Sequence, residues 1–464
     1  MTQPLFRSPW PVANRCLLLL TSLLAFPAAS LAGTLFCQIS NVSPTEHSLK
    51  ISCAISEFPT PGRLEMRFTD RFAGIDRLSE RLYGIQFKDA AGRRLLPELL
   101  GNGLYRVNPS TATHLTLEYQ VRLGEVQGVS CDPSKYALTS SLGSEYGFLL
   151  LSDLLPTVCA SGAGECASSA VRMKFQLPEG WQVATTEPQS FGSFDVAAVE
   201  RAVFLIGKLR VQKINLDPAT LHVALAGDTS LSDVQVTVLA EAIARQQAKM
   251  LGGMLENQSP SDYLVTLTPF PVPLTGMRSS ALTRGRTVVM MMNPDKDSRR
   301  TLALYQKHLA HELFHFYLPE VFQVRENFDW FWEGVARYVA LLTLNQLRFI
   351  TMREFLDEIS AEYEHYAANP LRNQLSLIAA SQGKFANTAN YDLVYRKGTL
   401  VAALYDLELR AQTNGQKNVM DVLRDLYVNY RQRELGNSEV LAVMRKAGRF
   451  DQFIRDYIES TETI

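Results

Sequence analysis

The sequence predicts an α+β fold in which a β-rich N-terminal region precedes a mixed region and a helical C-terminal part. As far as about residue 215, segments alternate apolar and polar residues and are broken by proline and glycine. From residue 216 strand and helix patterns alternate, and after residue 300 apolar residues recur almost throughout at helical spacing. With 464 residues and 46% hydrophobic content, the chain can bury about two or three cores.

The N-terminus predicts a secretory signal peptide over residues 1–32. Basic residues precede an apolar run from Cys16 to Ala25, and the small residues Ser30 and Ala32 mark a cleavage site before Gly33. An uncleaved membrane anchor is the alternative, but the run is shorter than the about 20 apolar residues of a span. No later segment is long and apolar enough to span a bilayer. We therefore expect a secreted or periplasmic protein.

Residues 33–215 predict a β-sandwich-like N-terminal domain. Its expected strands include Leu49–Ile55, Leu115–Val121 and Val171–Phe175. The cysteines that follow the leader are Cys37, Cys53, Cys131, Cys159 and Cys166. In an oxidising compartment five cysteines allow two disulfides and one cysteine left over, in about 15 ways. The pairings that span the shortest segments are Cys37 with Cys53, across a hairpin, and Cys159 with Cys166, across a short loop. All of them precede residue 170, so we expect them to stiffen this domain and not to bind metal.

Residues 216–464 predict a second domain, mixed over 216–300 and helical over 300–464. Its expected elements are a strand at Leu221–Leu225, a helix at Asp233–Leu251, a strand at Arg286–Met292 and a helix at Asp329–Leu347. Thr351 and Glu354 have the spacing of a capping box. Asn414 and Gly415 are expected to close a helix that begins near Asp392.

The segment from His311 to His315 reads H-E-x-x-H and predicts a metal site. Residues i and i+4 of a helix lie on one face, about 6 Å apart at Cβ, so His311 and His315 can bind one ion. Glu312, beside them, has the position of a general base in zinc hydrolases. Pro319 is expected to end this helix. The alternative is that both histidines are hydrogen-bonded core residues, which is the role we expect for His308.

A third ligand is expected from the following helix. A metzincin needs glycine and histidine where this chain has Leu318 and Val321, so that class is excluded. Glu333 is the preferred carboxylate, because Gly334 beside it costs a helix about 1 kcal/mol and indicates close approach of a second helix. The rival carboxylates are Glu320, Glu326 and Asp329. The chain has a formal net charge of −1 and no basic cluster, so nucleic-acid binding is not expected.

Beyond the motif, the chain resembles the glycyl aminopeptidase family of gluzincin zinc metallopeptidases, which are relatives of aminopeptidase N. The likeness rests on His311-Glu312-Leu313-Phe314-His315, on Trp332-Glu333-Gly334-Val335-Ala336 and on Tyr395-Arg396-Lys397-Gly398. It implies a thermolysin-like catalytic domain behind a β domain, with Zn²⁺ held by the two histidines and Glu333. It also implies that Tyr395 donates a hydrogen bond to the oxyanion of the reaction.

The same resemblance implies that Gly276, Met277 and Arg278 belong to the substrate-binding segment. Relatives have an acidic residue there, which holds the free α-amine of the substrate. This chain has no acidic residue between Asp262 and Asp295, but it has Arg278, Arg284 and Arg286. Arginines in this segment favour substrates that bear a carboxylate over those that present an ammonium group.

The leading hypothesis is therefore a secreted or periplasmic zinc metallopeptidase that acts on a peptide or protein substrate. The substrate backbone is expected to pair with the strand Arg286–Met292. The alternatives are a non-catalytic binding or assembly factor built on a peptidase fold, and a zinc hydrolase of non-peptide amides or esters. Exopeptidase and endopeptidase activity are both compatible with these residues.

Overall fold

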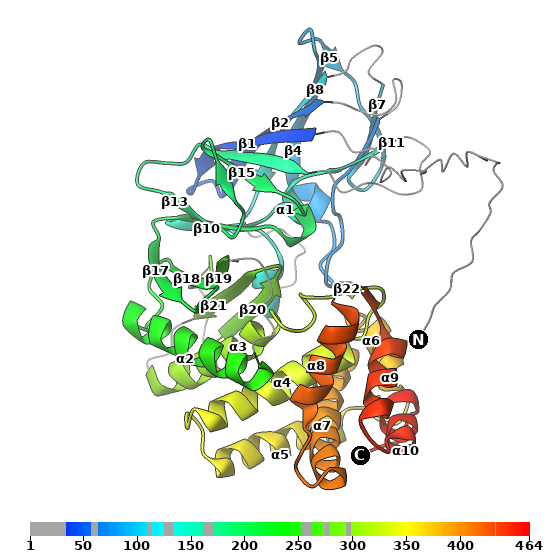
Figure 1. The fold of residues 1–464 in the computed structure, drawn as a ribbon. Helices are drawn as coiled ribbons and strands as arrows, with labels where there is room; N and C mark the ends of the chain where they lie inside the picture. Colours follow the sequence, from blue (N-terminus) through cyan, green and yellow to red (C-terminus); the bar gives the residue numbers. More distant parts are fainter. Residues whose placement is uncertain are drawn as a thin grey trace, which may run out of the picture. The chain divides into compact units, whose positions relative to one another are not determined.

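Strands form the first half of the described chain and helices most of the second half (Figure 1). The structure is a computed structural model that describes residues 34–56, 64–108, 114–124, 133–160, 170–252, 262–272, 274, 278–293, 298–431 and 433–464. From Ala32 to Ile464 the chain forms a single compact unit. The predicted α+β class with a helical C-terminal part is confirmed.

The N-terminal part contains three sheets. The largest has the strand order β14-β15-β12-β1-β2-β8-β4-β5, and two four-stranded sheets have the orders β13-β16-β10-β9 and β11-β3-β7-β6. The strands are β1 (Thr34–Ser43), β2 (Ser48–Ser56), β3 (Leu64–Arg67), β4 (Leu82–Asp89), β5 (Arg94–Leu95), β6 (Glu98–Gly101), β7 (Leu104–Val107), β8 (His114–Arg122), β9 (Ser141–Leu142), β10 (Tyr146–Leu150), β11 (Thr157–Ala160), β12 (Val171–Phe175), β13 (Gln182–Ala184), β14 (Gln189–Ser190), β15 (Ser193–Val196) and β16 (Val203–Gly207).

These sheets share one hydrophobic core, as the predicted sandwich requires. Leu49, Ile51 and Ile55 of β2 are buried together with residues of the two smaller sheets, because alternate side chains of a strand point to the same face. Cys37 and Cys53 lie opposite each other in the β1–β2 hairpin and form the predicted disulfide. Such a bond is typical of an oxidising compartment.

The second predicted disulfide falls partly on residues that the structure does not describe. Cys159 is disulfide-bonded. Its predicted partner, Cys166, and the remaining cysteine, Cys131, both lie outside the described residues. The pairing of Cys159 with Cys166 therefore stays a prediction.

A five-stranded sheet links the β part to the helices. Its order is β17 (Arg210–Asn215), β18 (Thr220–Leu225), β19 (Asp262–Thr268), β21 (Thr287–Asn293) and β20 (Arg278–Arg284), and only the outer pairs β17–β18 and β20–β21 are antiparallel. The predicted strands near Leu221 and Thr287 are confirmed. β17 belongs to this sheet although it precedes residue 216, where the second domain was predicted to begin.

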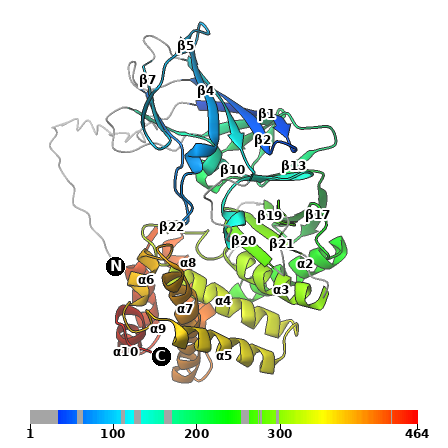
Figure 2. The same ribbon diagram turned by 180° about the vertical axis from the view of Figure 1, so that it is seen from behind.

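Both faces of the central strands of this sheet are buried. Val288, Met290 and Met292 of β21 pack against the helices on one face, whereas Val289 and Met291 pack against β10 and β16 of the N-terminal part. A central strand that is covered on both sides reads as an unbroken apolar run, as β21 does. The helices α2 and α3 lie along the face opposite the N-terminal sheets (Figure 2).

The helices of the second half are amphipathic and form the largest core with this sheet. They are α2 (Asp233–Leu251), α3 (Ser298–Phe314), α4 (Asp329–Gln346), α5 (Met352–Ala368), α6 (Leu377–Gln382), α7 (Thr388–Gln412), α8 (Val419–Tyr430), α9 (Asn437–Ala447) and α10 (Asp451–Ile454). The N-terminal part adds α1 (Leu151–Leu154) and the short helices η1 (Leu78–Arg81), η2 (Pro133–Leu138) and η3 (Val199–Arg201). The short helix η4 (Arg455–Glu459) follows α10. The short strand β22 (Gln323–Val324) pairs with β23 (Glu434–Leu435).

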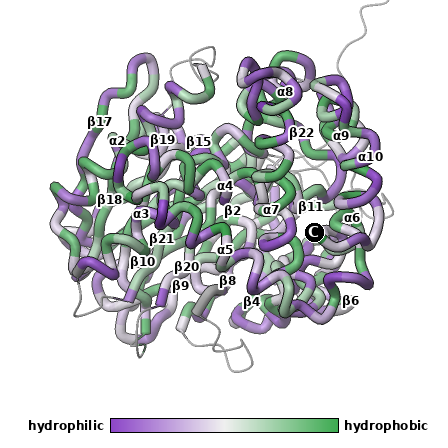
Figure 3. The backbone as a smooth tube through the Cα atoms, turned by 90° about the horizontal axis from the view of Figure 1, so that it is seen from below, coloured by the Kyte–Doolittle hydropathy of each residue, from purple (hydrophilic) through white to green (hydrophobic). Residues whose placement is uncertain are grey.

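Hydrophobic and hydrophilic residues alternate along these helices, as Figure 3 shows. The helix predicted over Asp233–Leu251 has those bounds, and the predicted capping box of Thr351 and Glu354 is present. Among the described residues, no helix combines the length and apolar character that a membrane crossing requires.

Two local predictions need correction. β21, the strand on which substrate was expected to pair, has β19 on one side and β20 on the other, so the edge strand next to it is β20, and β17 forms the opposite edge. The motif helix α3 ends at Phe314, five residues before Pro319. Hydrogen bonds between residues three positions apart, such as His315 N–H to the Glu312 carbonyl, replace the α-helical pattern there.

Candidate metal centre

Two consecutive helices bring together the three predicted metal ligands. His311 and His315 come from α3 and the turn that follows it, and Glu333 comes from the first turns of α4. The two Nε2 atoms are 3.1 Å apart, and they lie 3.2 Å and 3.4 Å from Glu333 Oε2. Among the described residues, these three make up the one group of His, Cys, Asp and Glu side chains whose donor atoms converge in this way.

The spacing of these atoms fits a zinc ion. Zn–N and Zn–O distances of about 2 Å and tetrahedral angles give ligand atoms roughly 3.3 Å apart, which the three observed distances match. Glu333 Oε2 is buried and has no hydrogen-bond partner of good geometry in the described part of the chain. A buried carboxylate oxygen without such a partner is costly unless a cation occupies the position beside it.

The contacts of His315 fix the orientation of its ring. Its Nδ1 lies 2.8 Å from the Leu318 carbonyl, which makes Nδ1 the donor and directs Nε2 towards Glu333. Burial alone would lower the pKa of His315, but the nearby carboxylate of Glu333 raises it to about 9. A metal ion that binds here therefore competes with a proton for His315.

Glu312 lies next to the ligands but points its carboxylate towards the edge strand. The Thr283 hydroxyl of β20 contacts Glu312 twice, at 2.7 Å from Oε2 and 2.8 Å from the backbone carbonyl. Glu312 is only 6% exposed and lines the cleft above the ligands. A carboxylate in this position can take a proton from a water molecule that is held between the ligands and the substrate.

Tyr395 reaches the site from α7. The backbones of α4 and α7 touch at Gly334 and Gly398, where a Cβ on either residue would lie within 2.7 Å of backbone atoms of the other helix. This close approach explains the glycine at 334 that the sequence singled out. The Tyr395 ring lies 6.3 Å from the His311 ring and stacks on Tyr391, one turn earlier. Burial and the charge of Glu333 raise the pKa of Tyr395, so its hydroxyl remains a donor.

One contact of the site has no counterpart in the sequence motifs. Lys384, between α6 and α7, lies 2.7 Å from Glu333 Oε1 and 2.9 Å from Asp329 Oδ2. Burial would raise the pKa of Glu333, but Lys384 and the two histidines hold it well below its usual range. No spacing rule connects Lys384 with Glu333, because the two are 51 residues apart.

The rival carboxylates have other partners. Asp329 pairs with Lys384, Glu320 pairs with Arg201, and Glu326 accepts a hydrogen bond from the backbone of Asn437. His308 makes the wall contact expected of it, since its Nε2 lies 3.0 Å from the Ser279 hydroxyl. Burial lowers the pKa of His308 to about 4, so this histidine is neutral.

A cleft of about 1150 Å³ opens above the ligands. Its walls are the last four residues of β20, the end of α3, the start of α4, the segment between α6 and α7, and parts of the N-terminal region. Of the three predicted substrate-binding residues, Gly276 and Met277 lie outside the described residues. Arg278 is exposed at the first residue of β20 and does not line the cleft. The cleft wall contains only Ala281–Arg284, at the other end of the strand, where Glu312 lies.

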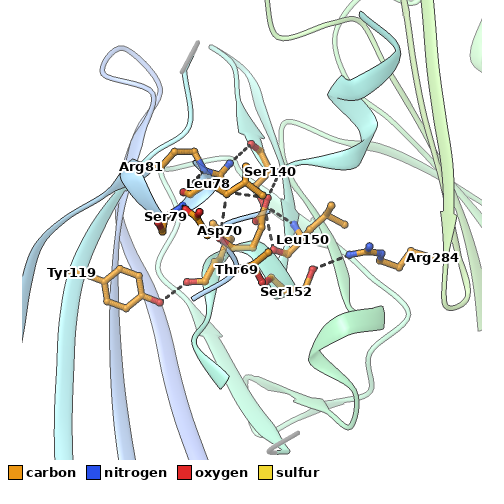
Figure 4. A network of polar contacts seen from close by, with 12 residues as sticks. Thr69, Asp70, Leu78, Ser79, Arg81, Tyr119, Ser140, Leu150, Ser152 and Arg284 are labelled. Carbon is orange, nitrogen blue, oxygen red and sulfur yellow. Dashed lines mark hydrogen bonds and ion pairs between the residues drawn. The ribbon is translucent and has the colours of Figure 1, made fainter. Parts of the chain in front are cut away.

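Arg284 is the arginine of this segment that does line the cleft. It donates a hydrogen bond to the Ser152 hydroxyl at 2.8 Å, and its guanidinium lies 4.5 Å from the centre of the Phe72 ring. Figure 4 shows Ser152 beside a polar network. In this network Arg81 donates to the Ser140 carbonyl, and the Ser140 hydroxyl bonds to the backbone of Leu150. The buried ion pair between Arg81 and Asp153 anchors this network. The N-terminal part thus fixes a cationic side chain at the edge strand.

Solved structures share this architecture. No family model and no curated protein matches the sequence. An aminopeptidase N family protein from Idiomarina loihiensis superposes with a TM-score of 0.76 at 17% identity, over 93% of this chain and 76% of that chain. An M1 zinc metallopeptidase mutant from Deinococcus radiodurans, bound to a Tyr-Ser-Ala substrate, superposes with a TM-score of 0.56 at 15% identity over 94% of each chain. At such identities the likeness shows the fold, and this chain has the fold of these peptidases.

Proposed function

We propose that this protein is a zinc-dependent metallopeptidase. The observation that supports it best is the convergence of His311, His315 and Glu333 Oε2 at tetrahedral spacing, below a cleft that also contains a carboxylate and a phenol. The shared fold with zinc metallopeptidases agrees with this proposal. The N-terminal signal pattern and the Cys37–Cys53 disulfide favour a secreted or periplasmic location.

The residues divide the chemistry among them. When bound, Zn²⁺ supplies a Lewis acid that polarises the scissile carbonyl and makes a neighbouring water acidic. Glu312 takes the proton of the attacking water and later returns it to the leaving amine. The Tyr395 hydroxyl donates a hydrogen bond to the oxygen on which negative charge develops. Thr283 keeps Glu312 oriented during both proton transfers.

The edge strand β20 is the expected partner of the substrate backbone. Among the described residues no strand pairs with β20 on the side away from β21, and its residues Ala281–Arg284 line the cleft next to Glu312. An extended peptide that adds to this edge would satisfy its backbone groups and pass over the metal ligands. Such pairing is independent of substrate side chains, which is consistent with a peptide or protein substrate.

The direct test combines metal analysis with a peptide library. We expect the mature chain from Gly33 to contain about one zinc per chain. Cleavage of library peptides should be lost after treatment with a chelator and restored by Zn²⁺. Cleavage by the metal-free protein would overturn the proposal. So would zinc-loaded protein that binds but never cleaves peptides, which is the outcome expected of a binding factor.

Tyr395→Phe is expected to lower kcat by about 10²–10³ with little change in KM, because the lost hydrogen bond forms only as charge develops on the oxygen. Steady-state kinetics on one library substrate measures both constants. Tyr391→Phe is the matched variant, since Tyr391 also lines the cleft and stacks on Tyr395. A larger loss of kcat from Tyr391→Phe would show that Tyr391, and not Tyr395, is the oxyanion donor.

Arg284→Met is expected to weaken selection for carboxylate-bearing substrates. Among the described residues Arg284 forms no ion pair with a carboxylate. Its guanidinium donates to the Ser152 hydroxyl and packs on the Phe72 ring in the wall of the cleft, where a substrate carboxylate can approach it. A hydrogen bond to a charged group contributes about 1.5–3 kcal/mol, or roughly ten- to a hundredfold in kcat/KM. Peptides that differ only in a free or amidated C-terminus, or in Glu against Gln, measure the effect.

The matched variant for this experiment is Arg286→Met. Arg286 lies two residues further on, donates to the Thr186 carbonyl and does not line the cleft. It should leave the discrimination between acid and amide substrates unchanged. Equal discrimination in wild type and Arg284→Met would show that Arg284 only joins the N-terminal part to the edge strand.

A further inference from the structure

Lys384 is a buried cation at the back of the metal site. Only 6% of the residue is exposed, and its Nζ lies within 3 Å of two carboxylates, Glu333 and Asp329. The ammonium also lies 5.0 Å from the centre of the Tyr395 ring. One side chain therefore contacts both the carboxylate ligand and the proposed oxyanion donor.

The contact with Glu333 separates the two oxygens of this carboxylate. Oε1 accepts the hydrogen bond of Lys384 at 2.7 Å, whereas Oε2 lies between the two histidines. While Lys384 holds Oε1, Oε2 is the oxygen that would be presented to a metal ion. A carboxylate that is free to rotate can bind through both oxygens and raise the coordination number.

The position of Lys384 is not explained by packing alone. Removing an ammonium group from water is costly, and the carboxylates of Glu333 and Asp329 offset this cost because both lie in direct contact with the Lys384 ammonium. A second lysine shows the contrast. Lys397 of α7 is also fully buried, but its Nζ contacts the carbonyl of Glu462 and no carboxylate of the metal site.

We propose that Lys384 is a positioning residue that restricts Glu333 to binding the metal through one oxygen. This proposal rests on the proposed metal site. Keeping Oε1 occupied leaves a coordination position open for water and substrate, as catalytic zinc sites require. The cation–π contact between Lys384 and the Tyr395 ring also holds this phenol in place beside Glu333.

Metal affinity is a poor measure of this role, because two effects oppose each other. Removing the ammonium group removes its repulsion of a cation, while freeing Glu333 disorders the ligand. Coordination number separates them, and cobalt(II) in place of zinc reports it, since four-coordinate cobalt absorbs visible light far more strongly than five-coordinate cobalt. The absorption spectrum of the cobalt-loaded full-length chain is therefore the measurement.

Wild type and Lys384→Arg are expected to give the intense four-coordinate spectrum. Lys384→Met should give the weaker five-coordinate spectrum, with kcat/KM of the zinc enzyme lowered by about ten- to a hundredfold. The double variant Asp329→Asn/Lys384→Met should remain five-coordinate, since it neutralises Asp329 without restoring the contact to Glu333. Lys397→Met is the matched control and should keep the wild-type spectrum.

Three results would overturn this role of Lys384. The first is a four-coordinate spectrum for Lys384→Met together with wild-type kcat/KM. The second is a four-coordinate spectrum in the double variant Asp329→Asn/Lys384→Met. The third is a five-coordinate spectrum in Lys397→Met. If Lys384→Met does not fold, as judged by circular dichroism, Lys384→Leu, which also has no donor for Glu333 Oε1, replaces it with the same expectations. A wild-type protein that binds neither cobalt nor zinc would instead contradict the metal site itself.

Discussion

Glu312→Gln is expected to lower kcat/KM for peptide hydrolysis by about 10²–10⁴ while the zinc content stays near one per chain. The amide has the shape of the carboxylate and can still accept from the Thr283 hydroxyl, but it cannot take a proton from water. Glu312 does not belong to the group of converging ligand atoms, so the metal should remain bound. Kinetics with one cleaved peptide and metal analysis of the same preparation give both numbers.

Glu320→Gln is the matched control for this experiment. Glu320 is another carboxylate of the same cleft, but it pairs with Arg201 and is not one of the three side chains whose donor atoms converge. We expect its replacement to change kcat/KM much less than Glu312→Gln does. Full activity of Glu312→Gln, or a greater loss from Glu320→Gln, would mean that another group acts as the base.

Glu333→Gln is expected to weaken zinc binding by on the order of a hundredfold or more. The substitution removes the charge of a direct ligand, which should exceed the ten- to hundredfold effect typical of residues behind the ligands. It also removes the group that raises the pKa of His315 to about 9, so His315 should lose its proton more readily in the metal-free variant. Competition with a chromogenic chelator measures the dissociation constant.

Asp329→Asn provides the comparison, because Asp329 lies one turn before Glu333 on α4 and contacts the same Lys384. It was also a rival for the third ligand. Retention of one zinc per chain in Asp329→Asn, together with its loss in Glu333→Gln, would assign the ligand to Glu333. The opposite pattern would make Asp329 the ligand and exclude the arrangement described above.

The sequence was sufficient for features that depend on local geometry. The spacing of His311 and His315 places both on one helix face whatever surrounds them, and Gly334 indicated a close helix contact that the structure places against Gly398. The disulfide of Cys37 with Cys53 follows from the register of a hairpin. Each of these predictions needs only the periodicity of one element or of two neighbouring ones.

The tertiary structure decided what depends on contacts between distant segments. The pairing of β21 on both sides makes β20 the edge strand next to it, and this order of strands has no local signal. The same pairing leaves Arg278 outside the cleft and brings Arg284 into it. Lys384 meets Glu333 because α6, which precedes it, packs against the start of α4, where Ser381 contacts Asn327 and Trp330. An ion pair between residues 51 positions apart is set by packing, and no sequence period encodes it.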